Sequence, residues 1–383
     1  MADPKDTVYK ADPHTRAKHA ILKEYLKRWL PILSRQARTL GSDWRLLYVD
    51  GFAGAGEYSG AVPGSPLVAI EAAAQHCHEF HVPIVFMFIE KRKDRVEHLR
   101  NLVADKKLAI LGRPQLIVDP VEGDCETEVL KLVGEHKRLG RKLGPAFFFL
   151  DQFGYSSFSM ALVRTILAED VCEVFSYLNW NLLHPFMTDQ TKWAGITKAF
   201  GGDEWKTVLG LAGRKKEERF RDVYTQALRD RGGARYTFPF AMRDHSDRII
   251  YWLFFCTNNI RGREEMKKAM WTVDRSGGFE FSDKHSAQFG KLFSVDDDWL
   301  ADHLFEEHEG KVLTVEEVRE YVLTKTPCHS FLKALGLLER SDRLELVDPP
   351  EGRRRGSFTN DQLGVRFRRK PGRQGSLFPS TAP

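Results

Sequence analysis

Short apolar runs alternate with amphipathic stretches along the first half of the chain. The spacing of apolar residues in the amphipathic stretches predicts helices over 66–78, 93–104 and 126–139. The apolar runs predict buried strands at RLLYVD (45–50), PIVFMFIE (83–90), QLIVD (115–119), AFFFLD (146–151) and CEVFSYLN (172–179). Strands and helices that alternate in this way predict an α/β fold with a parallel, Rossmann-like sheet and crossover helices.

Three further segments extend this first domain, which we place at residues 1–290. An amphipathic helix over 15–38 precedes the first strand. Residues 184–234 are polar and helical, and they are too long for a connecting loop, so they are interpreted as a helical insertion. RYTFPFAM (235–242) and RIIYWLFFCT (248–257) predict two more strands that close the sheet in an antiparallel manner.

The composition changes after residue 290. Residues 291–350 predict three short helices and a strand-like LELV, and Thr314 with Glu317 forms a capping box. This order predicts a small winged helix-turn-helix domain. Residues 351–383 carry eight Lys/Arg against two acids, a net charge of +6, whereas residues 1–350 sum to −1. We expect a basic disordered tail over 351–383, either an electrostatic arm for phosphates or a solubilising appendage.

Composition excludes several classes of protein. With 42% apolar and 29% charged residues, the chain can bury a core, so wholesale disorder is excluded. No run approaches the roughly 18 apolar residues of a membrane helix, and the first residues lack a secretory apolar region. Five scattered cysteines without CxxC spacing indicate reduced thiols, and we expect a cytoplasmic protein. The His76–His81 segment, HCHEFH, is interpreted as a surface cluster, and we expect no metal site.

Acidic residues follow four predicted strands, at the sheet edge where open α/β folds bind ligands. The first strand leads into Asp50-Gly51-Phe52-Ala53-Gly54-Ala55-Gly56, whose glycines allow the backbone to approach a ligand closely. The second strand ends at Glu90, Gly123-Asp124 follows the third, and Asp151 ends the fourth. One interpretation is a Rossmann-like sheet with ordinary turn glycines and strand-end acids. The other is a cofactor site.

This ordered set of motifs resembles that of class I S-adenosylmethionine (SAM)-dependent methyltransferases. The resemblance implies that Asp50, Gly51, Phe52, Gly54 and Gly56 surround the amino-acid part of SAM. It further implies that Glu90 holds the ribose and that Asp124 approaches the adenine.

A narrower resemblance covers residues 10–345. HTRAKHAILKEYL, YVDGFAGAGEY, FIEKRKDRVEHL, FFFLDQFGY and the segment ending in MKKAMW are similar to the three-Cys-motif partner proteins. Membership implies a methyltransferase-like domain followed by a winged helix-turn-helix. It also implies a companion protein with a three-cysteine, radical-SAM-like motif.

The segment after the fourth strand suggests the substrate chemistry. Methyltransferases of exocyclic amines carry Asp/Asn-Pro-Pro-Tyr/Phe there, and their aromatic residue stacks on a flipped-out base. In this chain Asp151 would accept hydrogen bonds from the amine, Gln152 would supply a carbonyl, and Phe153 or Tyr155 would stack. Both prolines are missing, and Gln152 is expected to loosen the turn.

Lys18 lies in an N-terminal segment that resembles that of a ribosomal-RNA adenine-N6 methyltransferase family. It would contact a carboxylate of the cofactor or a substrate phosphate, or else be a solvated lysine on an amphipathic helix. The sequence as a whole predicts a SAM-dependent methyltransferase-like protein that acts on nucleic acid. The alternative is a catalytically weak scaffold that binds SAM or nucleic acid and supports the three-cysteine companion.

Overall fold

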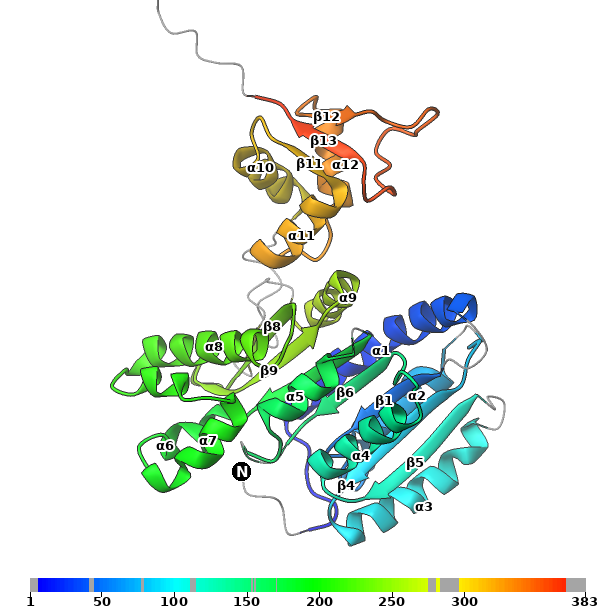
Figure 1. Ribbon diagram of the computed structural model, residues 1–383, viewed down its shortest axis with the longest axis vertical. Helices are drawn as coiled ribbons and strands as arrows, with labels where there is room; N and C mark the ends of the chain where they lie inside the picture. Colours follow the sequence, from blue (N-terminus) through cyan, green and yellow to red (C-terminus); the bar gives the residue numbers. More distant parts are fainter. Residues whose placement is uncertain are drawn as a thin grey trace, which may run out of the picture. The chain divides into compact units, whose positions relative to one another are not determined.

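The computed structural model divides the chain into two compact units, Met1–Lys291 and Leu292–Pro383 (Figure 1). The expected break near residue 290 lies within two residues of this division. The structure describes residues 6–40, 45–76, 79–110, 115–152, 154, 156–169, 171–274, 280–282 and 296–369.

An eight-stranded sheet forms the centre of the first unit (Figure 1). Its strand order is β10-β8-β9-β7-β6-β1-β4-β5. The strands are β1 (Leu46–Asp50), β4 (Ile84–Glu90), β5 (Leu116–Glu122), β6 (Ala146–Leu150), β7 (Cys172–Leu178), β8 (Tyr236–Arg243), β9 (Ile249–Thr257) and β10 (Glu280–Ser282). Among these strands β9 alone runs against the others, since it pairs antiparallel with both β7 and β8. The two late strands therefore close the sheet through antiparallel pairs, as the sequence predicts, while β8 itself runs in the direction of the first strands.

Alternation along the strands divides the core into two layers. In β1, Tyr48 faces one cluster of buried residues and Val49 faces the other. In β6, Phe147 and Phe148 divide in the same way. Because both faces of the sheet are covered, the central strands are apolar throughout, which is why they appear as continuous apolar runs in the sequence.

Helices from distant parts of the sequence cover each face. One layer receives residues of α1 (Pro13–Leu40), α2 (Ser65–Ala74), α3 (Lys93–Ile110) and α9 (Ile260–Trp271). The other receives residues of α4 (Cys125–Arg138), α5 (Met160–Leu167), α6 (Trp180–Phe186), α7 (Trp193–Phe200) and α8 (Gly213–Asp230). The last three, with short 3-10 turns at Gln190–Lys192 and Glu204–Val208, lie between β7 and β8, in the segment of the expected insertion. A small hairpin, β2 (Glu57–Tyr58) and β3 (Val62–Pro63), follows the glycine-rich turn.

The second unit has its own core. Its elements are α10 (Asp297–Glu307), β11 (Val312–Thr314), α11 (Val315–Lys325), α12 (Leu332–Arg340), β12 (Leu344–Val347) and β13 (Gly364–Phe367). The capping box at Thr314 and Glu317 is present. The strands form an antiparallel sheet in the order β11-β13-β12.

The expected disordered tail over 351–383 is wrong for its first half. β13 is the central strand of the small sheet, and its Val365 and Phe367 are fully buried. Arg353 is largely buried and forms a double contact with Glu339. A basic, glycine-containing segment folds here because these two apolar side chains and this buried ion pair join it to the core. Residues 370–383 lie outside the described residues.

The first unit is a mixed α/β domain with a large, mostly parallel sheet. No helix in the described ranges combines the length and apolar character that a membrane crossing requires.

Candidate active site

The glycine-rich turn begins at a buried carboxyl group. Asp50 ends β1 with no exposed surface, and its Oδ1 accepts a hydrogen bond from the Phe52 amide at 3.1 Å. Its Oδ2 is buried without a hydrogen-bond partner among the described residues. Burial raises the pKa of Asp50 to about 7, and the negative charge of Asp151 raises it further. Hydrogen bonds from the Ser65 hydroxyl and the Phe52 amide, and the positive charge of Lys18, offset part of this rise. A cationic group on a ligand would favour the ionised form.

Glycine is required in this turn for two different reasons. A Cβ at Gly51 would lie 2.5 Å from the Sγ of Cys125, and at Gly56, whose φ is +85°, it would lie 2.5 Å from Leu99. Close packing therefore excludes side chains at both positions. Gly54 also has a positive φ of +62°, but no atom lies within 4 Å of its Cβ position. The turn therefore presents bare backbone to open space at Gly54, as close approach of a ligand requires.

The Glu90 carboxylate is fixed by backbone amides at the end of β4. Its Oε2 accepts from the Gly54 amide at 3.0 Å, and its Oε1 accepts from the Arg92 amide at 2.8 Å. Its side chain is therefore joined directly to the glycine-rich turn, as the strand-end pattern predicts. Each oxygen keeps a second lone pair for a hydroxyl donor.

Asp124 lies beside Glu90 but has a structural task. The Gly123 amide donates to the Glu90 carbonyl at 3.0 Å, which places this turn against the end of β4. Asp124 is the N-cap of α4, and its Oδ2 accepts from the amide and hydroxyl of Thr127. Capping accounts for this acid without a ligand.

Lys18 and Asp151, which are 133 residues apart, form an ion pair. Both side chains are mostly buried, with 7% and 17% of their surface exposed. The Lys18 ammonium also lies 5.4 Å from the ring centre of Tyr177 and 6.0 Å from that of Tyr251. The solvated-lysine interpretation is therefore wrong, because α1 carries Lys18 into a box of aromatic rings and a carboxylate.

This pair lines a cavity of about 480 Å³, in the range of small-molecule sites. The remaining lining is mostly aromatic and acidic or carries amide groups, and it includes Tyr9, Tyr58, Tyr177, Tyr251, Asp12, Asp244, Asn179 and Asn181. The sequence analysis did not identify these tyrosines or the two acids. Tyr177 and Asn179 lie at the end of a predicted strand, the one signal that pointed to them. The tyrosines of β2 and β9 gave no signal.

Gln152 fixes the loop after β6. It is almost fully buried, its Nε2 donates to the Tyr177 carbonyl at 3.3 Å, and its Oε1 accepts from the Ser157 amide at 2.9 Å. The side-chain amide of Gln152 therefore links the end of β7 to Ser157, whereas the turn that was expected to loosen includes residues outside the described ranges. Phe153 and Tyr155, the expected stacking residues, lie outside the described residues.

The histidines of α1 contact the same region. His14 lines the cavity, and its Nε2 lies 2.8 Å from the Arg243 carbonyl. Burial and the adjacent Lys18 lower the pKa of His19 to about 3, so this imidazole is neutral. In the part of the chain that the structure describes, no group of three or more His, Cys, Asp or Glu is arranged to hold a metal ion.

Comparison with known proteins gives structural likenesses alone. No protein-family model and no curated protein sequence matches the chain. EvdMO1 aligns at 11% identity over 68% of this chain and 46% of its own, with a TM-score of 0.32. This chain thus spans less than half of EvdMO1.

Two methyltransferase structures also align. Trm1 from Pyrococcus horikoshii, solved with S-adenosyl-L-methionine, aligns at 12% identity over 96% of this chain and 93% of its own, with a TM-score of 0.35. A putative S-adenosyl-L-methionine-dependent methyltransferase from Methanococcus maripaludis aligns at 11% identity over 68% and 97%, with a TM-score of 0.26. Because all three TM-scores are below 0.5, none of these likenesses assigns a family, a cofactor or an activity to this chain.

Proposed function

We propose that this chain is a SAM-dependent methyltransferase that acts on an exocyclic base amine of nucleic acid. One observation carries the proposal: an N–H donor, the Lys18 ammonium, is bound to Asp151 between aromatic rings, close enough to Asp50 to affect its pKa. The protein thus already binds an amine nitrogen beside the glycine-rich turn.

The residues around that turn fit SAM. The unpartnered Oδ2 of Asp50 is an acceptor for the amino group of its methionine part. The open backbone at Gly54 allows close approach, and Glu90 has lone pairs for the two ribose hydroxyls. When bound, SAM supplies an electrophilic methyl group on a positively charged sulfur.

The cavity residues would orient the substrate amine. Asp151 accepts its N–H group once Lys18 moves aside, and the Tyr177 and Tyr251 rings provide faces on which a flipped-out base stacks.

The second unit supports nucleic acid as the substrate. Its order α10-β11-α11-α12-β12-β13 fits the proposed winged helix-turn-helix. Its charge is polarised: residues 296–320 carry ten acids and two bases, whereas residues 321–369 carry six acids and ten bases. Positive charge thus gathers in the half that holds β12 and β13, where phosphate contacts are expected.

The same ion pair favours one alternative. If Lys18 occupies Asp151 permanently, the acceptor is closed, and the chain is a catalytically weak scaffold for a three-cysteine companion protein. Methyl transfer distinguishes the two, because a scaffold requires none.

The test is transfer of tritiated methyl from SAM to total RNA and to duplex DNA. We expect transfer by the wild type, and a loss of at least about 100-fold in Asp151→Ala because the amine loses its orientation. Asp189→Ala, a surface helix cap in the insertion, is the matched control and keeps full activity. Equal transfer by Asp151→Ala would refute the assignment of the acceptor. No transfer by the wild type would favour the scaffold.

A further inference from the structure

A second cavity lies at the opposite end of the sheet from the candidate active site. It has a volume of about 150 Å³ and is lined by residues of α1 and α9 and by the beginning of β7. Pro145 and Val171, which directly precede β6 and β7, line it as well. Asp50 and Asp151 follow the carboxyl ends of their strands, so this cavity is separate from the site described above.

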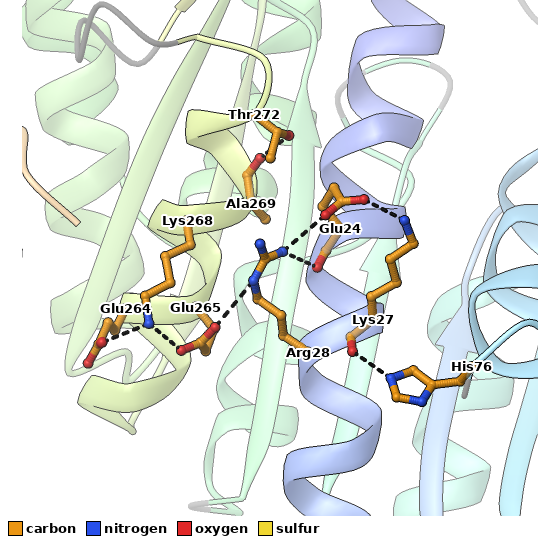
Figure 2. Close-up of polar contacts among 9 residues, drawn as sticks. All are labelled: Glu24, Lys27, Arg28, His76, Glu264, Glu265, Lys268, Ala269 and Thr272. Carbon is orange, nitrogen blue, oxygen red and sulfur yellow. Dashed lines mark hydrogen bonds and ion pairs between the residues drawn. The ribbon is translucent and has the colours of Figure 1, made fainter. Parts of the chain in front are cut away.

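The wall of this cavity is mainly apolar, and an ion pair joins the two helices that contribute to it. Trp29, Leu33 and Ala37 of α1 line it, and Ile32 and Val171 contribute partly exposed side chains. Figure 2 shows Arg28 of α1 between Glu24 of its own helix and Glu265 of α9, whose Oε2 lies 3.6 Å from the Arg28 Nε. Lys268 contacts Glu265 at 2.7 Å and Glu264 at 2.8 Å. The Arg28–Glu265 pair joins α1 to α9, whereas the Lys268 pairs lie within α9.

A buried carboxyl group lies on the sheet side of the cavity. Glu173 is 6% exposed, it accepts a hydrogen bond from the Tyr25 hydroxyl, and it accepts a second from its cross-strand neighbour Thr257 at 2.8 Å. Both donors are neutral, and no ion pair to Glu173 is present among the described residues. A Cβ at Gly262 would lie 2.0 Å from Glu173 Oε1, so the glycine makes room for the carboxyl group.

The charges that face Glu173 leave it uncompensated. Burial raises its pKa to about 7, against hydrogen bonds from Tyr25, Thr257 and Trp29 that lower it. On α9, Arg261 lines the same cavity, but its side chain is more than half exposed and its Nη1 lies 3.9 Å from Glu264. Glu265 is paired with Arg28 and Lys268. Tyr25 keeps its proton, because burial raises the pKa of its hydroxyl well above the usual value.

We propose that this cavity is a ligand site for a small arylalkyl amine. The ring would pack against Trp29, Leu33 and Val171, and the ammonium group would pair with the Glu173 carboxylate. A cavity of this volume holds a benzene-sized ring, and the cation also gains from the faces of Tyr25 and Trp29. An apolar wall with one buried, uncompensated carboxyl group selects this chemistry over anions and over large polar ligands.

The test is calorimetric titration of benzylamine into the full-length protein at pH 6 and pH 8, with benzyl alcohol as the neutral probe of equal size. Benzylamine keeps its charge at both values, while Glu173 ionises between them. We therefore expect benzylamine to bind about tenfold more tightly at pH 8, and benzyl alcohol to show no such gain. Glu173→Gln should abolish the pH dependence, whereas Glu97→Gln, at an exposed acid of α3 outside the cavity, should retain it.

A second variant does not depend on the buried acid. Val171→Trp places a larger side chain at a partly exposed position on the wall and should weaken benzylamine binding at least tenfold. Absence of saturable benzylamine binding at pH 8 would overturn the proposal. So would unchanged binding in Val171→Trp or a retained pH dependence in a folded Glu173→Gln protein.

Discussion

Acidic side chains of the first unit differ in function because different groups donate to them. Asp50 has one backbone donor and one unpartnered oxygen, whereas Glu90 has a backbone donor on each oxygen. Asp151 has a lysine, and Asp124 has only the first turn of its own helix. Only Asp50 among these four combines complete burial with an open acceptor, and burial raises its pKa to about 7.

The Asp50 carboxyl group predicts how stability depends on pH. Its pKa is about 7 in the folded protein against an ordinary 3.8, so the folded state binds more protons between these values. The free energy of unfolding should therefore fall as pH rises through this window. Asp50→Asn should remove up to about 4 kcal/mol of this fall.

Urea unfolding at pH 5 and pH 8 measures the effect. The Asp50→Asn protein should gain about 2.6 kcal/mol more stability over the wild type at pH 8 than at pH 5, because the unfolded carboxyl group is already ionised at pH 5. Asp124→Asn is the control, because its half-buried cap keeps an acceptor oxygen at both pH values. An equal pH dependence in wild type and Asp50→Asn would contradict the assigned burial.

At the scale of elements, the sequence predicted the strands and strand-end residues that are determined by the local pattern of apolar and polar residues. The strands of the parallel sheet were found because both faces are covered, and the acids were found because they end those strands. The meeting of Lys18 with Asp151 could not be predicted, since it depends on how α1 lies across the sheet. β13 was missed because only Val365 and Phe367 of its four residues face the core, inside a basic segment.

Removing β13 should therefore unfold the second unit. A chain that ends at residue 362 lacks the central strand of the small sheet. β11 and β12 then have no pairing partner, and their backbone amides and carbonyls are left unpaired along both edges. Differential scanning calorimetry should show loss of the unfolding transition of this unit, with that of the first unit retained. A chain that ends at residue 369 is the matched control and should keep both transitions. Retention of both in the shorter chain would show that β13 is dispensable.

At the scale of the whole molecule, charge is balanced overall but separated locally. The described part of the second unit carries sixteen acids and twelve bases, so it is not a basic domain as a whole. Arg353 is buried in its pair with Glu339. Arg355, Arg366 and Arg368 are exposed and lie 3.7–4.0 Å from Asp342 or Glu345. Nucleic-acid contacts should therefore come from the exposed arginines around β13.

A triple variant tests this surface. Arg355, Arg366 and Arg368 have 49–61% of their side-chain surface exposed. Changing all three to Gln should weaken binding to duplex DNA and reduce the slope of log K against log salt by up to about 3, since each phosphate contact contributes about 0.9. Fluorescence anisotropy at several salt concentrations measures the slope. Lys93, Lys131 and Arg214, exposed on the first unit, changed to Gln form the matched control. Equal slopes in the wild type and in the Arg355, Arg366 and Arg368 variant would show that this surface does not contact phosphates.

The central claim is that the glycine-rich turn and Glu90 form a SAM site. Calorimetric titration of SAM into the full-length protein tests it directly, with Glu90→Ala as the variant and the exposed Glu97→Ala on α3 as the control. Hydrogen bonds to a buried charged group contribute about 1.5–3 kcal/mol each, so the account predicts saturable binding that weakens at least about tenfold in Glu90→Ala and is unchanged in Glu97→Ala. Absence of SAM binding by the wild type, or equal affinity in a folded Glu90→Ala protein, would contradict it.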